Sequence, residues 1–263
     1  MSTSATVQFS DVVRAFGRGG HTAVDGVSLL VDETSRVGVV GESGSGKSTL
    51  VRMLVGLDHP SAGTVEFNGR SIAAMLPDEL RAFRLAVQLV AQDTTSSFDP
   101  RRTLRDAVRR PLEVLRGMDV AAADGAVDAT LRGLGLDPQL ANRLPHQVSG
   151  GQRQRFAIAR ALVVRPRLLV CDEAVSALDV SVQGAVLNLV KRYCREHGAG
   201  LVFVSHGLPA TAFVADRLVV MHRGRVVEDG PREQVLFRPE HAYTRTLVDA
   251  HRRTGDRRGS VPA

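Results

Sequence analysis

The stretch Gly41-Glu-Ser-Gly-Ser-Gly-Lys-Ser48 decides the fold, because its residues suit phosphate groups and a position between a strand and a helix. Its glycines let the backbone turn so that N–H groups point inward at phosphate oxygens. The apolar segment Val37–Val40 precedes it, and a helical run from 47 to 57 follows and directs its positive end at the same site. Lys47 is placed to reach the β- and γ-phosphates, and Ser48 to give its hydroxyl to Mg²⁺. The stretch therefore predicts a phosphate-binding loop (P-loop) between a buried strand and a helix.

A second apolar strand ends in two acidic residues. Leu168–Cys171 is followed by Asp172 and Glu173. A carboxylate at the carboxyl end of a parallel strand sits where ligands bind in open α/β sheets. We expect Asp172 to hold Mg²⁺ and Glu173 to act as the general base on the attacking water.

A third motif, Val148-Ser-Gly-Gly-Gln152, opens a helix that we expect from 152 to 164, ended by Pro166. Ser149 is a good N-cap, and Gly150 and Gly151 leave backbone N–H groups accessible. The segment is a second anion site with a helix N-terminus but no lysine of its own. A capped structural helix would explain the serine and one glycine, but not the whole motif.

Strands and helices alternate at both ends of the chain, around a helical middle. This pattern predicts an α/β core with a parallel sheet and a helical subdomain at about 93–165. Helices are predicted at 47–57 and 181–197, and Asn68-Gly69 is typical of a hairpin turn. The expected strands cover 5–9, 23–31, 36–41, 64–67, 87–91, 167–172, 200–205, 217–222 and 225–228.

Composition narrows the class of protein. The 263 residues include no apolar run near the ~18 that a membrane span needs. The first eleven residues lack the features of a signal peptide, so we expect a cytosolic protein. Cys171 and Cys194 are expected to be reduced packing residues. Lysine occurs only at 47 and 191, so arginine supplies most of the positive charges behind the net charge of +6. Because the arginines are scattered along the chain, we expect no nucleic acid partner.

In order and spacing, these motifs resemble the nucleotide-binding subunits of ABC transporters, over about residues 5–230. The resemblance implies a P-loop NTPase (RecA-like) core with an antiparallel β subdomain and an inserted helical subdomain. It also implies a domain at 1–230, followed at 231–263 by a short helical extension and a basic tail that we expect to be disordered. Gln92 resembles the glutamine of the family's Q-loop, Asp179 belongs to a D-loop-like Ser176–Asp179, and His206 resembles the switch histidine. Phe16 lies where an aromatic residue stacks on adenine.

The expected site follows from the motifs and the resemblance together. The catalytic residues are Glu173, His206 and Gln92, and the Mg²⁺ ligands are Ser48, Gln92 and Asp172. The expected ATP contacts are Phe16, Gly41, Glu42, Ser43, Gly44, Ser45, Gly46, Lys47, Ser48, Thr49, Ser149, Gly150, Gly151, Gln152 and Asp179.

Longer segments are similar to the dipeptide, oligopeptide and nickel importer ATPases. The chain departs from the usual family pattern at Gly207, where an Asp is common, at Ala174, where a Pro is frequent, and at Phe16, where Tyr is commoner. The resemblance implies ATP-driven import of peptides or nickel chelates at the cytoplasmic face of the membrane. The implied partners are permease subunits, a second ATP-binding subunit and, indirectly, an extracytoplasmic substrate-binding protein. The segments that carry this similarity are 92–101, 145–152, 176–183 and His241-Ala-Tyr-Thr-Arg245.

Two other classes share some of these motifs. A non-transport ABC ATPase that acts on DNA would insert a long coiled coil between the P-loop and the Ser-Gly-Gly-Gln segment, whereas roughly 100 residues without sustained heptads lie there. A P-loop kinase does not need Ser-Gly-Gly-Gln. An ATPase of the kind that acts on ribosomes usually carries two such cassettes, and we find one copy of each motif.

Overall fold

Two β-sheets organise the chain, one of six strands and one of four. The computed structural model describes residues 4–17, 20–92, 97–175 and 180–256. The six-stranded sheet has the order β10-β9-β3-β8-β7-β6, and the four-stranded sheet the order β2-β1-β4-β5. The strands are β1 Val7–Ala15, β2 Thr22–Val31, β3 Arg36–Val40, β4 Ala62–Phe67, β5 Arg70–Ser71, β6 Val87–Val90, β7 Leu168–Asp172, β8 Gly200–Val204, β9 Arg217–His222 and β10 Arg225–Pro231.

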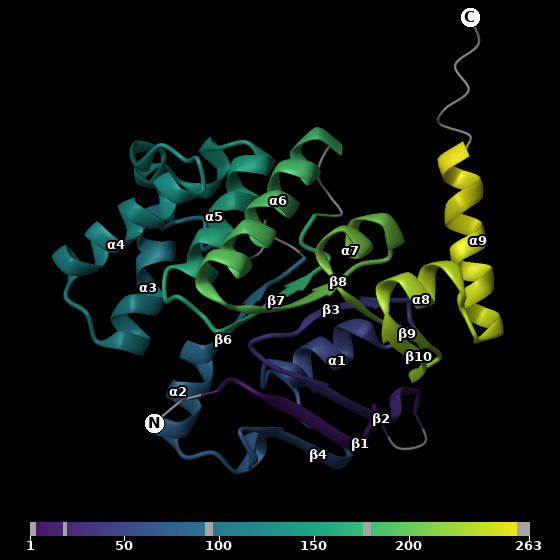
Figure 1. Cartoon of the computed structure of the whole chain (residues 1–263). Coiled ribbons are helices and arrows are strands. Elements are labelled where there is room, and N and C mark those ends of the chain that lie inside the picture. The colour runs from purple at the N-terminus through teal and green to yellow at the C-terminus, as the bar shows by residue number, and fades with distance from the viewer. Residues whose placement is uncertain (1–3, 18–19, 93–96, 176–179, 257–263) are drawn as a thin grey trace, which may run out of the picture.

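Helices cover the larger sheet and form a separate group at one end of it (Figure 1). Short 3₁₀ turns lie at Ile72–Ala74, Pro138–Asn142 and Pro145–Gln147. The α-helices are α1 Lys47–Leu54, α2 Pro77–Ala86, α3 Leu104–Arg116, α4 Val120–Gly133, α5 Gly150–Leu162, α6 Val180–His197, α7 Leu208–Val214, α8 Arg232–Phe237 and α9 Ala242–Asp256.

The central strands of the larger sheet are parallel and buried on both faces. β3 pairs in parallel with β8 and β9, and β7 with β6 and β8. Every residue of β8 is buried, which explains why its sequence reads as one apolar run rather than as an alternation. The edge strand β10 runs antiparallel to β9, so the expectation of a parallel sheet holds for the other five strands. The predicted fold class is confirmed.

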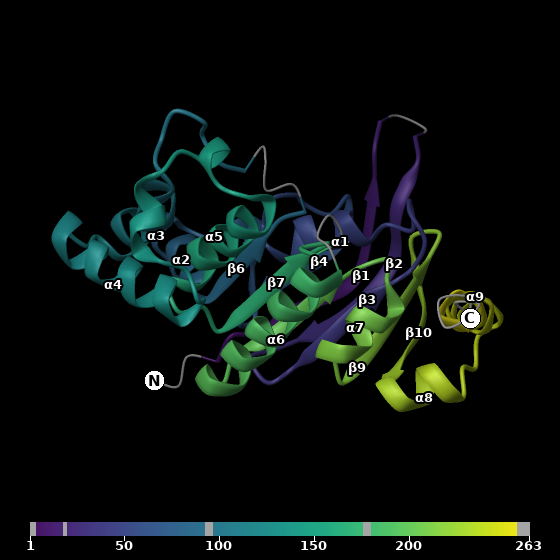
Figure 2. The same cartoon turned by 90° about the horizontal axis from the view of Figure 1, so that it is seen from above.

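The core is arranged in layers on either side of this sheet. α1 lies between the two sheets, and its Leu50 and Leu54 pack in one apolar cluster with Phe9 of β1 and Val39 of β3. The views in Figures 1 and 2 place α6 and α7 on the opposite face of the larger sheet. This arrangement leaves the carboxyl ends of β3, β6, β7 and β8 at one common edge.

The helices α3, α4 and α5 pack on one another beside the sheet. Thr103 and Asp119 cap α3 and α4 by accepting hydrogen bonds from N–H groups in each first turn. Arg109 of α3 holds the two helices together, with a guanidinium nitrogen 3.2 Å from Asp124 of α4 and another 2.8 Å from Glu113 of its own helix. The three helices are short, at 13, 14 and 13 residues, so the described part of the insert contains no long coiled coil.

The C-terminal segment returns to the sheet edge formed by β9 and β10. α8 packs on β10, and α9 packs against α7 and β10. α9 continues to Asp256, so the expected helical extension covers most of the segment after residue 230; residues 257–263 lie outside the described part. Among the described helices, none combines the length and apolar character that crossing a bilayer requires.

Several element boundaries differ from the sequence-based expectations. α1 ends at Leu54 rather than 57, because Gly56 adopts a φ of 70° and the N–H groups of Gly56 and Leu57 return to carbonyls of the last turn. α5 begins at Gly150 and ends at Leu162. α2 was not predicted, although Pro77 at its first turn is a start signal; Phe83 is the buried residue of this helix.

Candidate active site

The P-loop leaves β3 through glycines that no other residue could replace without movement. Gly41 has a φ of 155°, and a Cβ there would lie 2.2 Å from the carbonyl oxygen of Met221. Gly46 has a φ of 101°, and its Cβ would lie 2.1 Å from the carbonyl oxygen of Ala23. Both contacts are with backbone atoms of neighbouring strands or loops. The shape of the loop therefore depends on close approach of the chain as well as on glycine's conformational freedom.

Lys47 is buried at the centre of this loop. Its ammonium donates hydrogen bonds to the carbonyl oxygens of Gly41 at 2.8 Å and Glu42 at 2.6 Å, and to the hydroxyl of Ser45 at 3.2 Å. Burial lowers the pKa of Lys47, and the negative charge of Glu173 acts in the opposite direction. The loop thus holds a cation in place by its own oxygens.

Three polar side chains meet at the carboxyl edge of the larger sheet. Gln92 follows β6, Glu173 follows β7 and His206 follows β8, three adjacent strands. The Gln92 side-chain amide donates to the Glu173 carboxylate at 2.8 Å, and Nδ1 of His206 lies 3.6 Å from the same carboxylate. The structure therefore brings together the three residues that the sequence predicted as catalytic.

The backbone of Glu173 is in an uncommon conformation. Its φ of 48° lies in the left-handed region, which costs energy for a residue with a side chain. The N–H of Glu173 donates to the carbonyl oxygen of Val204 at 2.8 Å, which ties this conformation to the neighbouring strand. The turn directs the carboxylate toward Gln92 and His206.

Asp172 and Ser48 have the chemistry of a Mg²⁺ site. Burial raises the pKa of Asp172, the nearby charge of Glu173 adds to this, and a hydrogen bond with Ser48 opposes it. The Oδ1 atom of Asp172 is buried and has no hydrogen-bond partner among the described residues. A carboxylate oxygen beside a hydroxyl suits a hard divalent cation that keeps water and phosphate oxygens as its other ligands. This donor set fits Mg²⁺.

An open cleft joins the P-loop to the three side chains at the carboxyl edge of the larger sheet. Its described lining does not include Gly41, Glu42, Ser45 or Asp172. The first three of these contact Lys47 from within the loop. His21 and Ala23 line the cleft although the sequence gave no signal for them. The described lining residues are Phe16, His21, Ala23, Ser43, Gly44, Gly46, Lys47, Ser48, Thr49, Gln92, Glu173 and His206.

The Ser-Gly-Gly-Gln segment lies outside the described lining of this cleft. Ser149 caps α5 as expected: its hydroxyl accepts from the N–H of Gln152 at 3.2 Å, and the Gln152 side chain accepts from the N–H of Ser149 at 3.0 Å. Ser149 and Gly150 are exposed, and a Cβ on Gly150 would meet open space. Asp179 lies outside the described residues.

Comparison with known proteins identifies the family. A family model described as "ABC transporter" matches residues 24–176, more than half of the chain. The chain belongs to the ABC transporter family. This ABC protein is 44% identical over 229 residues to the oligopeptide transport ATP-binding protein OppF of Escherichia coli K12, covering 87% of this chain and 69% of that protein. It is 43% identical to the glutathione import ATP-binding protein GsiA of the same organism, covering 87% of this chain and 37% of that protein.

The fold of this ABC protein is also that of a solved ATP-binding cassette. It superposes on MJ0796, in a dimeric post-hydrolysis state bound to ADP and Pi, with a TM-score of 0.78 and 30% identity over 86% of this chain and 98% of that one. The family assignment and the prediction that the chain is an ABC transporter ATPase are confirmed. The roles of individual site residues stay predictions.

Phe16 stands at the rim of the cleft of this ABC ATPase. Its ring is 45% exposed, and the guanidinium of Arg14 lies 4.6 Å from the ring centroid. Because the cation covers one face of the ring, the other face is the one on which a planar base could stack. This arrangement fits the expected adenine contact.

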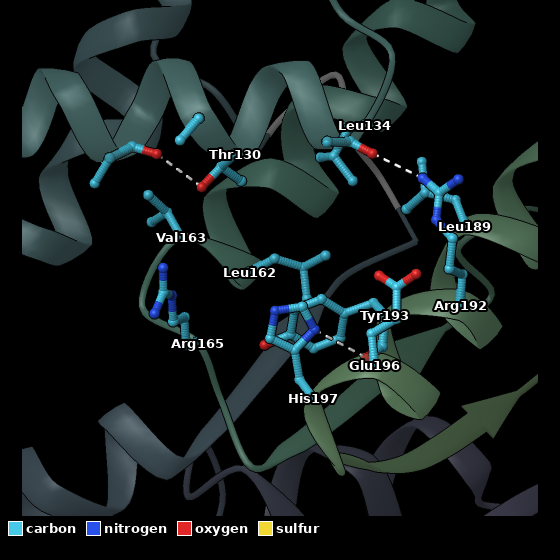
Figure 3. Close-up of a pocket in the computed structure, with 13 residues that line it drawn as sticks. Thr130, Leu134, Leu162, Val163, Arg165, Leu189, Arg192, Tyr193, Glu196 and His197 are labelled. Atoms are coloured by element: carbon cyan, nitrogen blue, oxygen red, sulfur yellow. Dashed lines mark hydrogen bonds between the residues drawn. The ribbon is translucent and has the colours of Figure 1, made fainter.

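A second cavity of the ABC ATPase, of about 210 Å³, lies away from the cleft, between α4, the end of α5 and α6 (Figure 3). Leu162, Val163 and Leu189 give it an apolar floor, while Arg165 and Glu196 stand at its edge. Arg192 of α6 spans it by donating to the carbonyl oxygen of Gly133 at 2.8 Å. The cavity lies where the inserted helices α4 and α5 meet the core helix α6.

Proposed function

We propose that this chain hydrolyses ATP as one of a pair of ATP-binding subunits, and that closure of the pair drives import of short peptides through membrane-spanning permease subunits. The observation that carries the proposal is the division of the site. The cleft gathers the P-loop, Glu173 and His206, whereas the described lining of that cleft does not include the exposed anion site at Ser149.

The cleft residues have separable roles in this proposal. Lys47 and the loop N–H groups bind the phosphates, and Ser48 and Asp172 hold Mg²⁺, which would neutralise phosphate charge. Glu173 accepts the proton of the attacking water. Gln92 and His206 orient the Glu173 carboxylate and the γ-phosphate. Both side chains already lie within 3.6 Å of that carboxylate.

Pairing supplies what each cleft lacks. A helix N-terminus at Ser149, with its N–H groups free of crowding, suits the outer face of a γ-phosphate. In a twofold dimer the cleft of each subunit meets the Ser149 segment of the other, so the same contact forms twice. The dimeric state of MJ0796 supports this arrangement, and the partner is a second copy or a related chain.

Pairing is tested by measuring the ATPase rate per subunit against protein concentration. The proposal predicts a steep rise with concentration, and predicts that Ser149→Arg binds ATP but does not hydrolyse it. Thr64→Arg, at an exposed position on β4 outside the cleft lining, is the matched control and should keep both properties. A rate per subunit that stays constant down to dilutions where sedimentation shows only monomer would exclude the composite site.

Cargo and membrane attachment are inferred from the relatives and from one exposed segment. OppF and GsiA are named for the transport of oligopeptides and of glutathione, which are peptides or peptide-like. Phe98 is buried beneath Arg160, whereas residues 99–102 are exposed after the Gln92 segment and are the part that we propose contacts the permease at the cytoplasmic face of the membrane.

Two measurements address this part of the proposal. Cysteines introduced at 99–102 should crosslink to the permease. Vesicles that contain the assembled transporter should accumulate a labelled oligopeptide in an ATP-dependent way; accumulation of a nickel chelate instead would overturn the peptide assignment.

A further inference from the structure

The C-terminal helix α9 contacts the P-loop directly, although most of the sequence lies between the two segments. The hydroxyl of Tyr243, in the first turn of α9, accepts a hydrogen bond from the N–H of Glu42 at 3.0 Å. The carbonyl oxygen of the same Glu42 residue accepts from the Lys47 ammonium at 2.6 Å. One residue of the loop is thus bound on one side by the phosphate-binding lysine and on the other by α9.

The ring of Tyr243 is fixed by a second set of contacts. It stacks on the ring of His222, the last residue of β9, with centroids 4.0 Å apart and planes 13° from parallel. Nε2 of His222 lies 3.4 Å from the carboxylate of Glu42. Glu228 of β10 holds the approach to α9, because its carboxylate accepts from the N–H groups of Glu240 and His241, both at 3.0 Å.

The same helix also contacts the segment that follows the switch histidine. Nε2 of His251 accepts from the N–H of Leu208, the first residue of α7, at 3.5 Å. Nδ1 of His251 faces the carbonyl oxygen of Leu247 at 2.8 Å, so the proton lies on Nδ1 and Nε2 is free to accept. Leu208 is only two residues beyond His206.

Apolar packing joins these two contacts into one unit. Val248 of α9 is 4% exposed and shares a buried cluster with Leu208 and with Val40, the residue immediately before the P-loop. Tyr243 and His251 are eight positions apart, which places them roughly 12 Å apart along the helix axis. α9 therefore touches both segments that the ATPase reaction uses, and it lies outside residues 24–176 that the family model matches.

We propose that α9 is a positioning element for the ATPase site: Tyr243 sets the Glu42 peptide of the P-loop, and His251 sets the start of α7 and with it His206. The two contacts act on different steps. The P-loop binds the phosphates before and during the reaction, whereas the switch histidine acts on the γ-phosphate as it is transferred. This inference rests on the proposed roles of Lys47 and His206.

The test separates KM from kcat in the full chain. Tyr243→Phe keeps the ring and removes only the accepting oxygen, and should raise the KM for ATP about three- to tenfold, the range expected for loss of one hydrogen bond, with kcat changed less than about twofold. His251→Leu should lower kcat about three- to tenfold and leave KM nearly unchanged. His251→Gln, whose amide oxygen can accept from Leu208, should restore kcat.

The other tyrosine of the chain provides a matched control. Tyr193→Phe removes a hydroxyl that donates to the carbonyl oxygen of Pro166, away from the cleft, and should leave KM and kcat unchanged. Amide hydrogen exchange, measured without nucleotide, should become faster at Glu42 in Tyr243→Phe and faster at Leu208 in His251→Leu.

Wild-type kinetics in both variants, or an equal change of KM and kcat in both, would overturn the proposal even if the exchange rates respond. Failure of the proposed function looks different: Lys47→Ala would then still bind ATP like the wild type, whatever α9 does.

Discussion

Replacing Glu173 with glutamine should stop hydrolysis while leaving ATP binding intact. The change keeps the shape of the side chain, and the amide oxygen can still accept from Gln92, which donates to the carboxylate at 2.8 Å. What is lost is the ability to take a proton from water. A positioned general base contributes about 10²- to 10⁴-fold, so the barrier should rise by about 3–5 kcal/mol.

The affinity for ATP should change less than about twofold, because Lys47 and the loop N–H groups supply phosphate binding and are untouched. The assay combines phosphate release at saturating ATP and Mg²⁺ with equilibrium titration of a fluorescent ATP analogue. Glu196→Gln, an exposed change of the same kind on α6, is the control and should behave like the wild type. A rate loss below about tenfold, or a loss of affinity as large as the loss of rate, would refute the assignment of Glu173 as the base.

Three further changes test the loop, the helical insert and the attachment of α9. Lys47→Ala should weaken ATP binding by about 10- to 100-fold, because charge-assisted hydrogen bonds to phosphate are worth about 1.5–3 kcal/mol; an unchanged titration would contradict this. Arg109→Met should lower the free energy of unfolding in urea by about 1–3 kcal/mol, because the Arg109 side chain is 17% exposed among three carboxylates. The control Arg110→Met, at a side chain that is 64% exposed, should lower it by about 0–0.5 kcal/mol. Equal effects of the two changes would show that the ion pairs of Arg109 add nothing to stability. Burial acts to raise the pKa of Glu228, but the neighbouring Thr244 hydroxyl and the N–H groups of Glu240 and His241 hold that pKa below its usual value of 4.5. The ionised Glu228 carboxylate therefore stabilises the fold above about pH 4.5, and this stabilisation is lost as pH falls through the lowered pKa. The stability difference between wild type and Glu228→Gln should therefore be largest near pH 7 and shrink below about pH 4, and a difference that grows on acidification would reverse the sign of this reasoning.

The parts of the site that the sequence predicted are those that depend on neighbouring residues. The P-loop works through consecutive backbone groups, so its spacing alone was informative. Gln92 and His206 were predicted from the family resemblance, and their meeting with Glu173 agrees with a general rule, because each follows a strand of a parallel sheet and such ends share one edge. The Ser149 cap was likewise readable from residues three apart.

The parts that the sequence did not predict depend on contacts between distant segments. Tyr243 and Glu42 are 201 positions apart, and nothing near either residue indicates the other. His21 lines the cleft only because β2 passes beside the P-loop. β1 was expected to end at Phe9, but it continues to Ala15 through register shifts with β2 that no local pattern announces.

The left-handed backbone of Glu173 places stability and activity in opposition at one residue. A side chain in that region costs on the order of 1 kcal/mol relative to glycine. Glu173→Gly would therefore relieve the backbone and remove the carboxylate in the same step. Selection of this chain for thermal tolerance alone would favour that variant and yield a more durable protein without turnover. Screens that seek more heat-resistant forms of this ATPase need an activity measurement at every round, because resistance to heat by itself rewards loss of the carboxylate that we predict to be the general base.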